Sequence, residues 1–446
     1  MKGAIAAGHP LTAQTGATVL AEGGNAVDAC IAAAFAAAVA EGPLTGPTGG
    51  GFLLVHSPDG QTTLLDCFFA VPEGSGGEME EIVIDFEDAG TQTFHVGEAS
   101  VAVPGLVPGL EEAHRRFGSH PWASLVEPAI ELAEGGIARD EPRDFLHRLL
   151  GGILLRTDAG ARVYGHPERI VTHEFSETLE RLRDVGSRAV VELMPELAND
   201  LDSYSVLERE PLRAQVAGYE VVTTPSPSRG GAIVLEVLTA LAALEAWSLH
   251  DEARAIGLAY ERSAAGPPTG TTHISVVDAD GVAASLSSTL GSGSGVFRGG
   301  TQLNNMLGEL DVIGAGPQAP GERLPSMMTP TMALAAGAPR LVVGSAGSVR
   351  LAGAIAQVAW RVLEGESVSE AIDAPRIHVQ GTKLHLEGGW AEDAIRHLAD
   401  SWEPVRWVGR NLFFGGVSAV ERLSDGSLAA AGDPRRGGAG VVVAEA

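Results

Sequence analysis

The chain has 446 residues, of which 45% are hydrophobic and 20% charged, enough for one large domain or two smaller ones. Its formal net charge of −27 argues against nucleic acid as a partner, because phosphate binding needs a basic face. The most apolar stretch, residues 29–40, is too short to span a bilayer. No secretion signal is apparent, and we expect a soluble, cytoplasmic protein with no membrane partner.

The first part of the chain predicts two helices followed by a strand hairpin. Residues 9–42 form the helices, which break at Gly23-Gly24, and Asn25 caps the second one. The glycine run 46–51 lacks the Lys-Ser/Thr end of a phosphate-binding loop, so we expect it to allow close strand packing. Strands 52–56 and 62–65 then pair across a Pro-Asp-Gly turn.

The middle of the chain predicts helices at 111–117, 122–134 and 232–244, and an extended segment at 219–224. We expect no metal and no cofactor. His173, Glu174 and Glu177 have helical spacing, but a zinc site would need a second histidine, so a solvated helix face is favoured. Cys30 and Cys67 lie in apolar contexts, which favours two buried thiols over a disulfide.

Residues 267–289 predict a strand hairpin with a reactive junction at its mouth. An alternating strand begins at Thr272, turns at Asp280-Gly281 and returns to Thr289. The hydroxyl of Thr271 could attack the unhindered carbonyl of Gly270, and hydrolysis would leave a new chain that begins with a threonine whose α-amine acts as its base. An ordinary strand that starts with two threonines is the alternative.

The last third predicts a second hairpin, residues 332–343, which turns at Gly337-Ala338-Pro339. Residues 344–348 then lead into a helix at 349–364. The glycine-rich loop 291–295 lacks the spacing and the acidic partner of a dinucleotide-binding loop.

Several of these segments together resemble the gamma-glutamyltranspeptidase family of N-terminal-nucleophile hydrolases. The resemblance rests on residues 23–29, 49–52, 270–278, 324–331, 344–348, 374–378 and 432–438. It implies an α+β fold, a four-layer αββα sandwich, over one domain of residues 1–446. It also implies self-cleavage into a large-subunit-like segment, 1–270, and a small-subunit-like segment, 271–446, that stay together as a heterodimer; further oligomerisation is left open.

The same resemblance implies the catalytic residues. Thr271 would be the nucleophile, and Thr289 would support it by a hydrogen bond to the nucleophile or to its amine. The backbone N–H groups of Gly347 and Ser348 would form the oxyanion hole. The family has two consecutive glycines there, and Ser348 replaces the second.

The positions that hold a glutamyl group in the family differ here. Phe68 stands where the family has an arginine for the donor α-carboxylate, and Met327 follows Ser326 where the family has paired serines. Around the donor amino group the aligned residues are Gly291, Met306 and Glu309. Phe68 and Met327 therefore predict an apolar acyl pocket, although Arg229 or Arg323 could restore a carboxylate clamp.

These residues predict an amidohydrolase or acyltransferase for a small-molecule amide or peptide, with an altered acyl-donor specificity. A true gamma-glutamyltransferase or glutathione hydrolase is the first alternative. A non-catalytic relative that serves as a binding or scaffold protein is the second.

Overall fold

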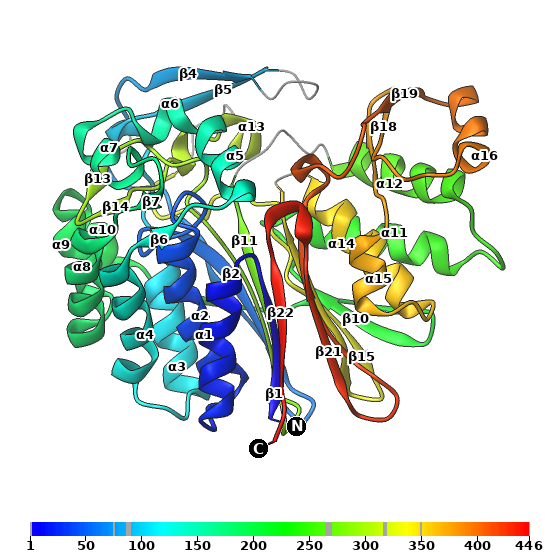
Figure 1. Ribbon diagram of the computed structural model, residues 1–446, viewed down its shortest axis with the longest axis horizontal. Helices are drawn as coiled ribbons and strands as arrows, with labels where there is room; N and C mark the ends of the chain where they lie inside the picture. Colours follow the sequence, from blue (N-terminus) through cyan, green and yellow to red (C-terminus); the bar gives the residue numbers. More distant parts are fainter. Residues whose placement is uncertain are drawn as a thin grey trace.

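The structure, a computed structural model, describes residues 2–74, 76–85, 91–263, 270–314, 319–347 and 350–445. Its centre is a pair of antiparallel sheets (Figure 1). The seven-stranded sheet has the order β22 (Ala439–Val443), β1 (Gly3–Ala7), β11 (Thr272–Asp278), β12 (Ala283–Thr289), β2 (Gly50–His56), β3 (Thr62–Cys67) and β8 (Leu207–Arg209). The six-stranded sheet has the order β21 (Leu428–Gly432), β20 (Gly416–Arg422), β16 (Ala338–Ala346), β15 (Thr331–Ala335), β10 (Tyr219–Thr223) and β9 (Leu212–Val216).

The two sheets pack face to face, with β11 and β12 lying against β16. Side chains on successive residues of a strand point to opposite faces, so β11 contributes to two apolar cores. Val277 belongs to the core between the sheets, together with Val342 of β16. Ile274 and Val276 belong to the core under the helices. The alternation predicted from the sequence for this strand is confirmed.

Helices cover the outer face of each sheet (Figure 1). On the seven-stranded side α1 (Pro10–Ala21), α2 (Ala26–Ala40) and α3 (Leu106–Phe117) pack on the sheet, and α4 (Trp122–Gly135) and α8 (His173–Val185) lie beyond α2. On the six-stranded side lie α11 (Gly230–Ala242), α12 (Leu249–Ser263), α14 (Leu351–Leu363) and α15 (Val368–Asp373). The two faces of the sheet pair are therefore shielded from water by different parts of the chain.

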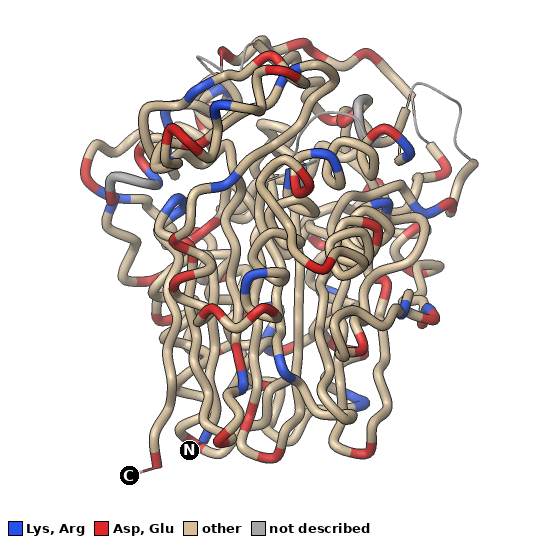
Figure 2. Tube along the Cα trace, turned by 90° about the vertical axis from the view of Figure 1, so that its right-hand side faces the viewer, with Lys and Arg blue, Asp and Glu red and all other residues tan. Residues whose placement is uncertain are grey.

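Smaller elements complete the fold. They are β4 (Glu80–Asp85), β5 (Thr91–Val96), β6 (Ile137–Ala138), α5 (Glu141–Leu149), α6 (Gly151–Leu154), α7 (Asp158–Tyr164), β7 (Arg169–Ile170), α9 (Arg188–Leu193), α10 (Ala198–Ser203), β13 (Phe297–Arg298), β14 (Thr301–Gln302), α13 (Leu310–Ile313), β17 (Ile377–Gln380), β18 (Lys383–Leu386), α16 (Glu392–Ile395) and β19 (Glu403–Arg406). Figure 2 shows acidic and basic residues interspersed along the trace.

The alanine-rich helix α2 is buried along its whole length. Asn25 caps it as predicted, since its side chain accepts hydrogen bonds from the N–H groups of Val27 and Asp28, and Asp28 bonds back to Asn25 in a capping box. Small side chains let this helix fit between the sheet and α4. In the part of the chain that the structure describes, no helix has both the length and the hydropathy needed to cross a bilayer.

Two sequence predictions about local structure are wrong. The hairpin between β15 and β16 turns at Ala336-Gly337, both with positive φ, rather than at residues 337–339. Pro339 lies inside β16 opposite Leu334, where the register shifts, because proline has no N–H to give to the ladder. Helix α3 begins at Leu106 rather than at residue 111, and it holds Pro108 in its first turn, where no backbone donor is needed.

Candidate active site

The hairpin of β11 and β12 brings Thr289 back to the mouth of β11, as predicted. Thr272 pairs with Ser288 in this antiparallel hairpin. Thr271, just before β11, and Thr289, the last residue of β12, therefore lie together at the open end. There the Thr289 hydroxyl donates a hydrogen bond to the carbonyl oxygen of Gly270. The same hydroxyl accepts from the N–H of Gly291 at 2.8 Å. Thr289 is thus aimed at the carbonyl of the Gly270-Thr271 peptide bond, rather than at the Thr271 hydroxyl.

Thr271 is 1% exposed, and its hydroxyl has no hydrogen-bond partner among the described residues. A buried polar group without a partner costs about 1–3 kcal/mol, and such groups deserve a functional explanation. The peptide before it approaches its neighbours closely. A Cβ on Gly270 would lie 2.6 Å from the carbonyl oxygen of Gly291 and 3.2 Å from Leu44, so glycine is required there.

Gly347 directly follows β16 and has a φ of +120°, a conformation that L side chains rarely adopt. A Cβ there would lie 2.7 Å from Cα of Gly415 and 3.7 Å from Nη2 of Arg436. The second predicted oxyanion-hole residue, Ser348, lies outside the described residues. The structure therefore places one of the two predicted backbone donors, in a backbone conformation suited to glycine.

Gly291, Met306 and Glu309 lie together beside the Gly270-Thr271 peptide bond. Gly291 has a φ of +72°, and a Cβ there would lie 2.9 Å from Oε1 of Glu309 and 3.2 Å from Sδ of Met306. The Glu309 carboxylate accepts from the N–H of Ser292 at 2.8 Å and from its hydroxyl at 2.9 Å. Glu309 thereby fixes the loop that supports Thr289, which is a role that the sequence did not predict.

Phe68, Met306 and Met327 share the apolar core between the sheets. The Phe68 ring stacks on Phe52 with centroids 5.3 Å apart. The hydroxyl of Ser326 accepts from the N–H of Met328 at 3.0 Å. The predicted site residues are buried in this region, and their role in holding an acyl group stays a prediction.

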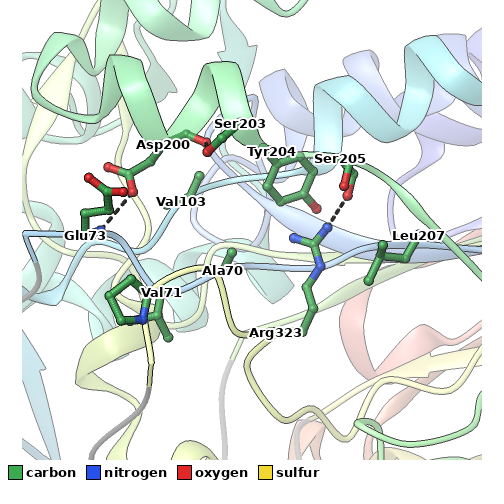
Figure 3. A pocket seen from close by; sticks show the side chains of 12 residues that line it. Ala70, Val71, Glu73, Val103, Asp200, Ser203, Tyr204, Ser205, Leu207 and Arg323 are labelled. Atoms are coloured by element: carbon green, nitrogen blue, oxygen red, sulfur yellow. Dashed lines mark hydrogen bonds between the residues drawn. The ribbon is translucent and has the colours of Figure 1, made fainter.

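Arg323 borders a separate cavity of about 310 Å³ (Figure 3). Its guanidinium lies 4.0 Å above the ring of Tyr204. It donates to the carbonyl oxygen of Phe68 at 3.0 Å and to that of Ser205. Because Arg323 is already engaged by backbone oxygens, it is poorly suited to the carboxylate clamp considered above. Burial lowers the pKa of the other candidate, Arg229, which precedes α11.

Within the described ranges, no group of three His, Cys, Asp or Glu side chains is placed to hold a metal ion. His173, Glu174 and Glu177 lie on an exposed face of α8. Cys30 and Cys67 are both free and buried. Burial is the main reason that the pKa of the Cys67 thiol is raised to about 12.

Sequence reasoning missed Glu41, the residue that ends α2. Its carboxylate is buried and accepts from the hydroxyl of Thr272 at 2.6 Å and from that of Thr12 at 2.8 Å. These partners are 231 and 29 residues away in the chain. A single acid after an alanine-rich helix gives no local signal for such contacts.

Two packed sheets with a glycine-threonine junction at a strand mouth are the arrangement of an N-terminal-nucleophile hydrolase. The chain matches the sequence profile of gamma-glutamyltranspeptidases over residues 12–192 and 250–443, and it belongs to that family.

Two sequence relatives carry the names of enzymes. The glutathione hydrolase proenzyme of Pseudomonas aeruginosa is 30% identical, over 99% of this chain and 94% of that protein. The acylase ACY 1 proenzyme of Pseudomonas sp. (strain SE83) is 28% identical, with the same coverage. Among solved structures, a cephalosporin acylase from Bacillus halodurans superposes with a TM-score of 0.84 at 21% identity, over 99% of this chain and 95% of that one. This last likeness shows the shared fold.

Proposed function

We propose that this protein is a self-processing amidohydrolase or acyltransferase of the four-layer αββα type, with Thr271 as its nucleophile. The observation that carries the proposal is the pair of hydroxyls at the Gly270-Thr271 bond. The Thr289 hydroxyl donates to the carbonyl that would be attacked. The Thr271 hydroxyl, on the next residue, is buried and has no partner in the described part of the chain.

Self-cleavage would proceed as an acyl shift followed by hydrolysis. Thr271 Oγ1 bonds to the carbonyl carbon of Gly270, and negative charge develops on the oxygen to which Thr289 donates. The C–N bond then breaks as the hydroxyl proton passes to nitrogen, which leaves an ester and a free α-amine on Thr271. Water hydrolyses the ester, so Gly270 ends as a carboxylate and Thr271 regains its hydroxyl.

Turnover would repeat this chemistry on an external amide. The α-amine of Thr271 accepts the proton of its own hydroxyl as that hydroxyl attacks the substrate carbonyl. The leaving amine takes the proton. Water or a second amine then attacks the ester, which releases the acyl group and restores the Thr271 hydroxyl. The backbone N–H of Gly347 is proposed as one oxyanion donor, together with Ser348.

We further propose that the two fragments remain a heterodimer after cleavage, because strands from both are interleaved in one sheet. β1 from the first fragment lies between β22 and β11 from the second. Separation of the fragments would break both ladders. The proenzyme relatives support processing into subunits.

The substrate is proposed to be an acyl amide that lacks the amino-acid head of a glutamyl group. Phe68 and Met327 support this, because neither can pair with a donor α-carboxylate. The similarity to an acylase is compatible with it, whereas the similarity to glutathione hydrolases keeps a glutamyl donor as the second candidate. Both names favour an enzyme over a binding or scaffold protein.

Intact mass and N-terminal sequencing of the purified protein test the nucleophile without a choice of substrate. We expect fragments 1–270 and 271–446 from the wild type. Thr271→Ala should remain one chain and lack activity. Turnover of an amide by a wild-type protein that stays intact would refute the mechanism.

A further inference from the structure

The carboxylate of Glu41 lies at a junction of segments that are far apart in sequence. It ends α2, and its two hydrogen-bond donors come from α1 and β11. A Cβ on Gly8, the residue after β1, would lie 2.4 Å from Oε2 of Glu41 and 2.8 Å from Oγ1 of Thr272. Glycine at position 8 therefore leaves the room that the bond between Glu41 and Thr272 needs.

Two arginines, Arg143, which is buried, and Arg436, which is half-buried, favour the charged form of this carboxylate. Arg143 of α5 and Arg436 of the C-terminal segment both act on Glu41 electrostatically. Burial raises the pKa of Glu41, whereas the two threonine hydroxyls and the two arginines act in the opposite direction. Arg436 also borders Gly347. The cluster of Glu41, Thr12, Thr272, Arg143 and Arg436 thus connects the nucleophile strand with the loop proposed to hold the oxyanion.

The position of Thr271 within this network is informative. On one side of it, the carbonyl of Gly270 is held by Thr289. On the other side, the side chain of Thr272 is held by Glu41. The Thr271 hydroxyl has no hydrogen-bond partner in the described chain to orient it, so the backbone between these two anchors fixes where its Cβ lies, and the side-chain rotamer then sets the direction of the hydroxyl.

We propose that Glu41 is a positioning residue for the nucleophile, which it orients by fixing Thr272. This inference rests on the proposed role of Thr271. Glu41 does not touch the scissile bond and is assigned no proton transfer. It restrains the first residue of β11, so that the hydroxyl one residue earlier faces the carbonyl it attacks. A small misplacement of a reacting group can reduce a rate by about 10².

Thr272 and Thr12 each donate to a different oxygen of the Glu41 carboxylate, so their valine variants form a matched pair. Thr272→Val removes the donor on the nucleophile strand, and Thr12→Val removes the donor on α1. Both threonines are buried, and their bonds to Glu41 are 2.6 Å and 2.8 Å long. If the Glu41 carboxylate only stabilised the fold, the two variants should have the same stability and the same processing rate.

Processing is followed by the appearance of fragments 1–270 and 271–446 after synthesis at 25 °C, and the thermal midpoint is measured on the same samples. We expect Thr272→Val to process about 10- to 100-fold more slowly than Thr12→Val, with similar midpoints. Thr272→Ser, which keeps the hydroxyl, should return to within about threefold of the wild type. After processing, Thr272→Val should lower kcat and leave KM unchanged, since the interaction would act on the reacting geometry.

Gly8→Ala is a second test that removes no hydrogen-bonding atom. Its new methyl group would displace Glu41 from Thr272, and we expect the same processing defect as in Thr272→Val. Equal processing by Thr272→Val and Thr12→Val would overturn the inference, as would a defect that follows only the fall in thermal midpoint. Cleavage in Thr271→Ala would instead refute the nucleophile, so the two failures are distinguishable.

Discussion

Replacing Thr289 by valine removes one hydroxyl and leaves the side chain nearly the same size. That hydroxyl donates to the Gly270 carbonyl oxygen and accepts from the N–H of Gly291. Loss of a single donor to a developing oxyanion lowers rates by about 10²–10³, or about 2.7–4 kcal/mol. The orphaned N–H of Gly291 would also lower the stability by about 1–3 kcal/mol. We therefore expect Thr289→Val to fold with reduced stability and to process at least 100-fold more slowly.

The assay is a time course of fragment formation on a denaturing gel, with intact mass at the end point and an unfolding curve for each variant. Thr289→Ser keeps a donor and should process within about tenfold of the wild type. The two effects are separable, because the lost stability changes the folded fraction whereas the lost donor changes the rate within folded molecules. Wild-type processing in folded Thr289→Val would show that the hydroxyl does not act on the carbonyl.

Three further predictions concern specificity and acid stability. In wild-type protein, kcat/KM for simple aliphatic acyl anilides should exceed that for a γ-glutamyl anilide, because Phe68 and Met327 offer no partner to the α-carboxylate; a tenfold glutamyl preference would contradict this. Unbranched acyl anilides should be preferred about tenfold over those branched next to the carbonyl, since a Cβ on Gly270 would meet the Gly291 oxygen at 2.6 Å; equal rates would contradict it. Burial lowers the pKa of His273 to about 3. As the pH falls from 6.5 to 5, only the unfolded chain therefore takes up a proton on this histidine, and the free energy of unfolding falls by about 2 kcal/mol. Denaturant titrations of unprocessed Thr271→Ala, with and without His273→Gln, should show this loss disappearing when the histidine is replaced; an unchanged pH dependence would contradict it.

Local signals were enough to predict much of the framework. Asn25 caps α2 because its side chain and that of Asp28 bond within three residues of each other. The Asp280-Gly281 turn sets the pairing of β11 with β12, and that pairing returns Thr289 to Gly270. Such features depend on neighbours that the sequence shows side by side.

The missed features depend on tertiary contacts. The sequence could bring Thr289 close to the junction, yet the direction of its hydroxyl is set by Gly291 and by the orientation of the Gly270 carbonyl. The role of Glu41 becomes visible only in the folded chain, where α2 and β11 lie side by side. The turn between β15 and β16 lies earlier than the sequence predicts, because Pro339, a residue typical of turns, lies inside β16, where a shift of strand register accommodates it.

A self-cleaving precursor holds its first substrate within its own chain. In the proposed mechanism the same hydroxyl attacks first the Gly270 carbonyl and later the carbonyl of an external amide, so both carbonyls must occupy nearly the same place. The groups that now surround Gly270 are then those that will surround the acyl carbon. Among them are the Thr289 hydroxyl, the Gly291 carbonyl and the side chain of Leu44. These three groups carry no charge, whereas the Glu309 carboxylate lies 2.9 Å from where a Cβ on Gly291 would be. Phe68, where the family has an arginine, would therefore affect binding of the far end of the acyl group. The close approach of Gly291 would limit the shape of the end that reacts.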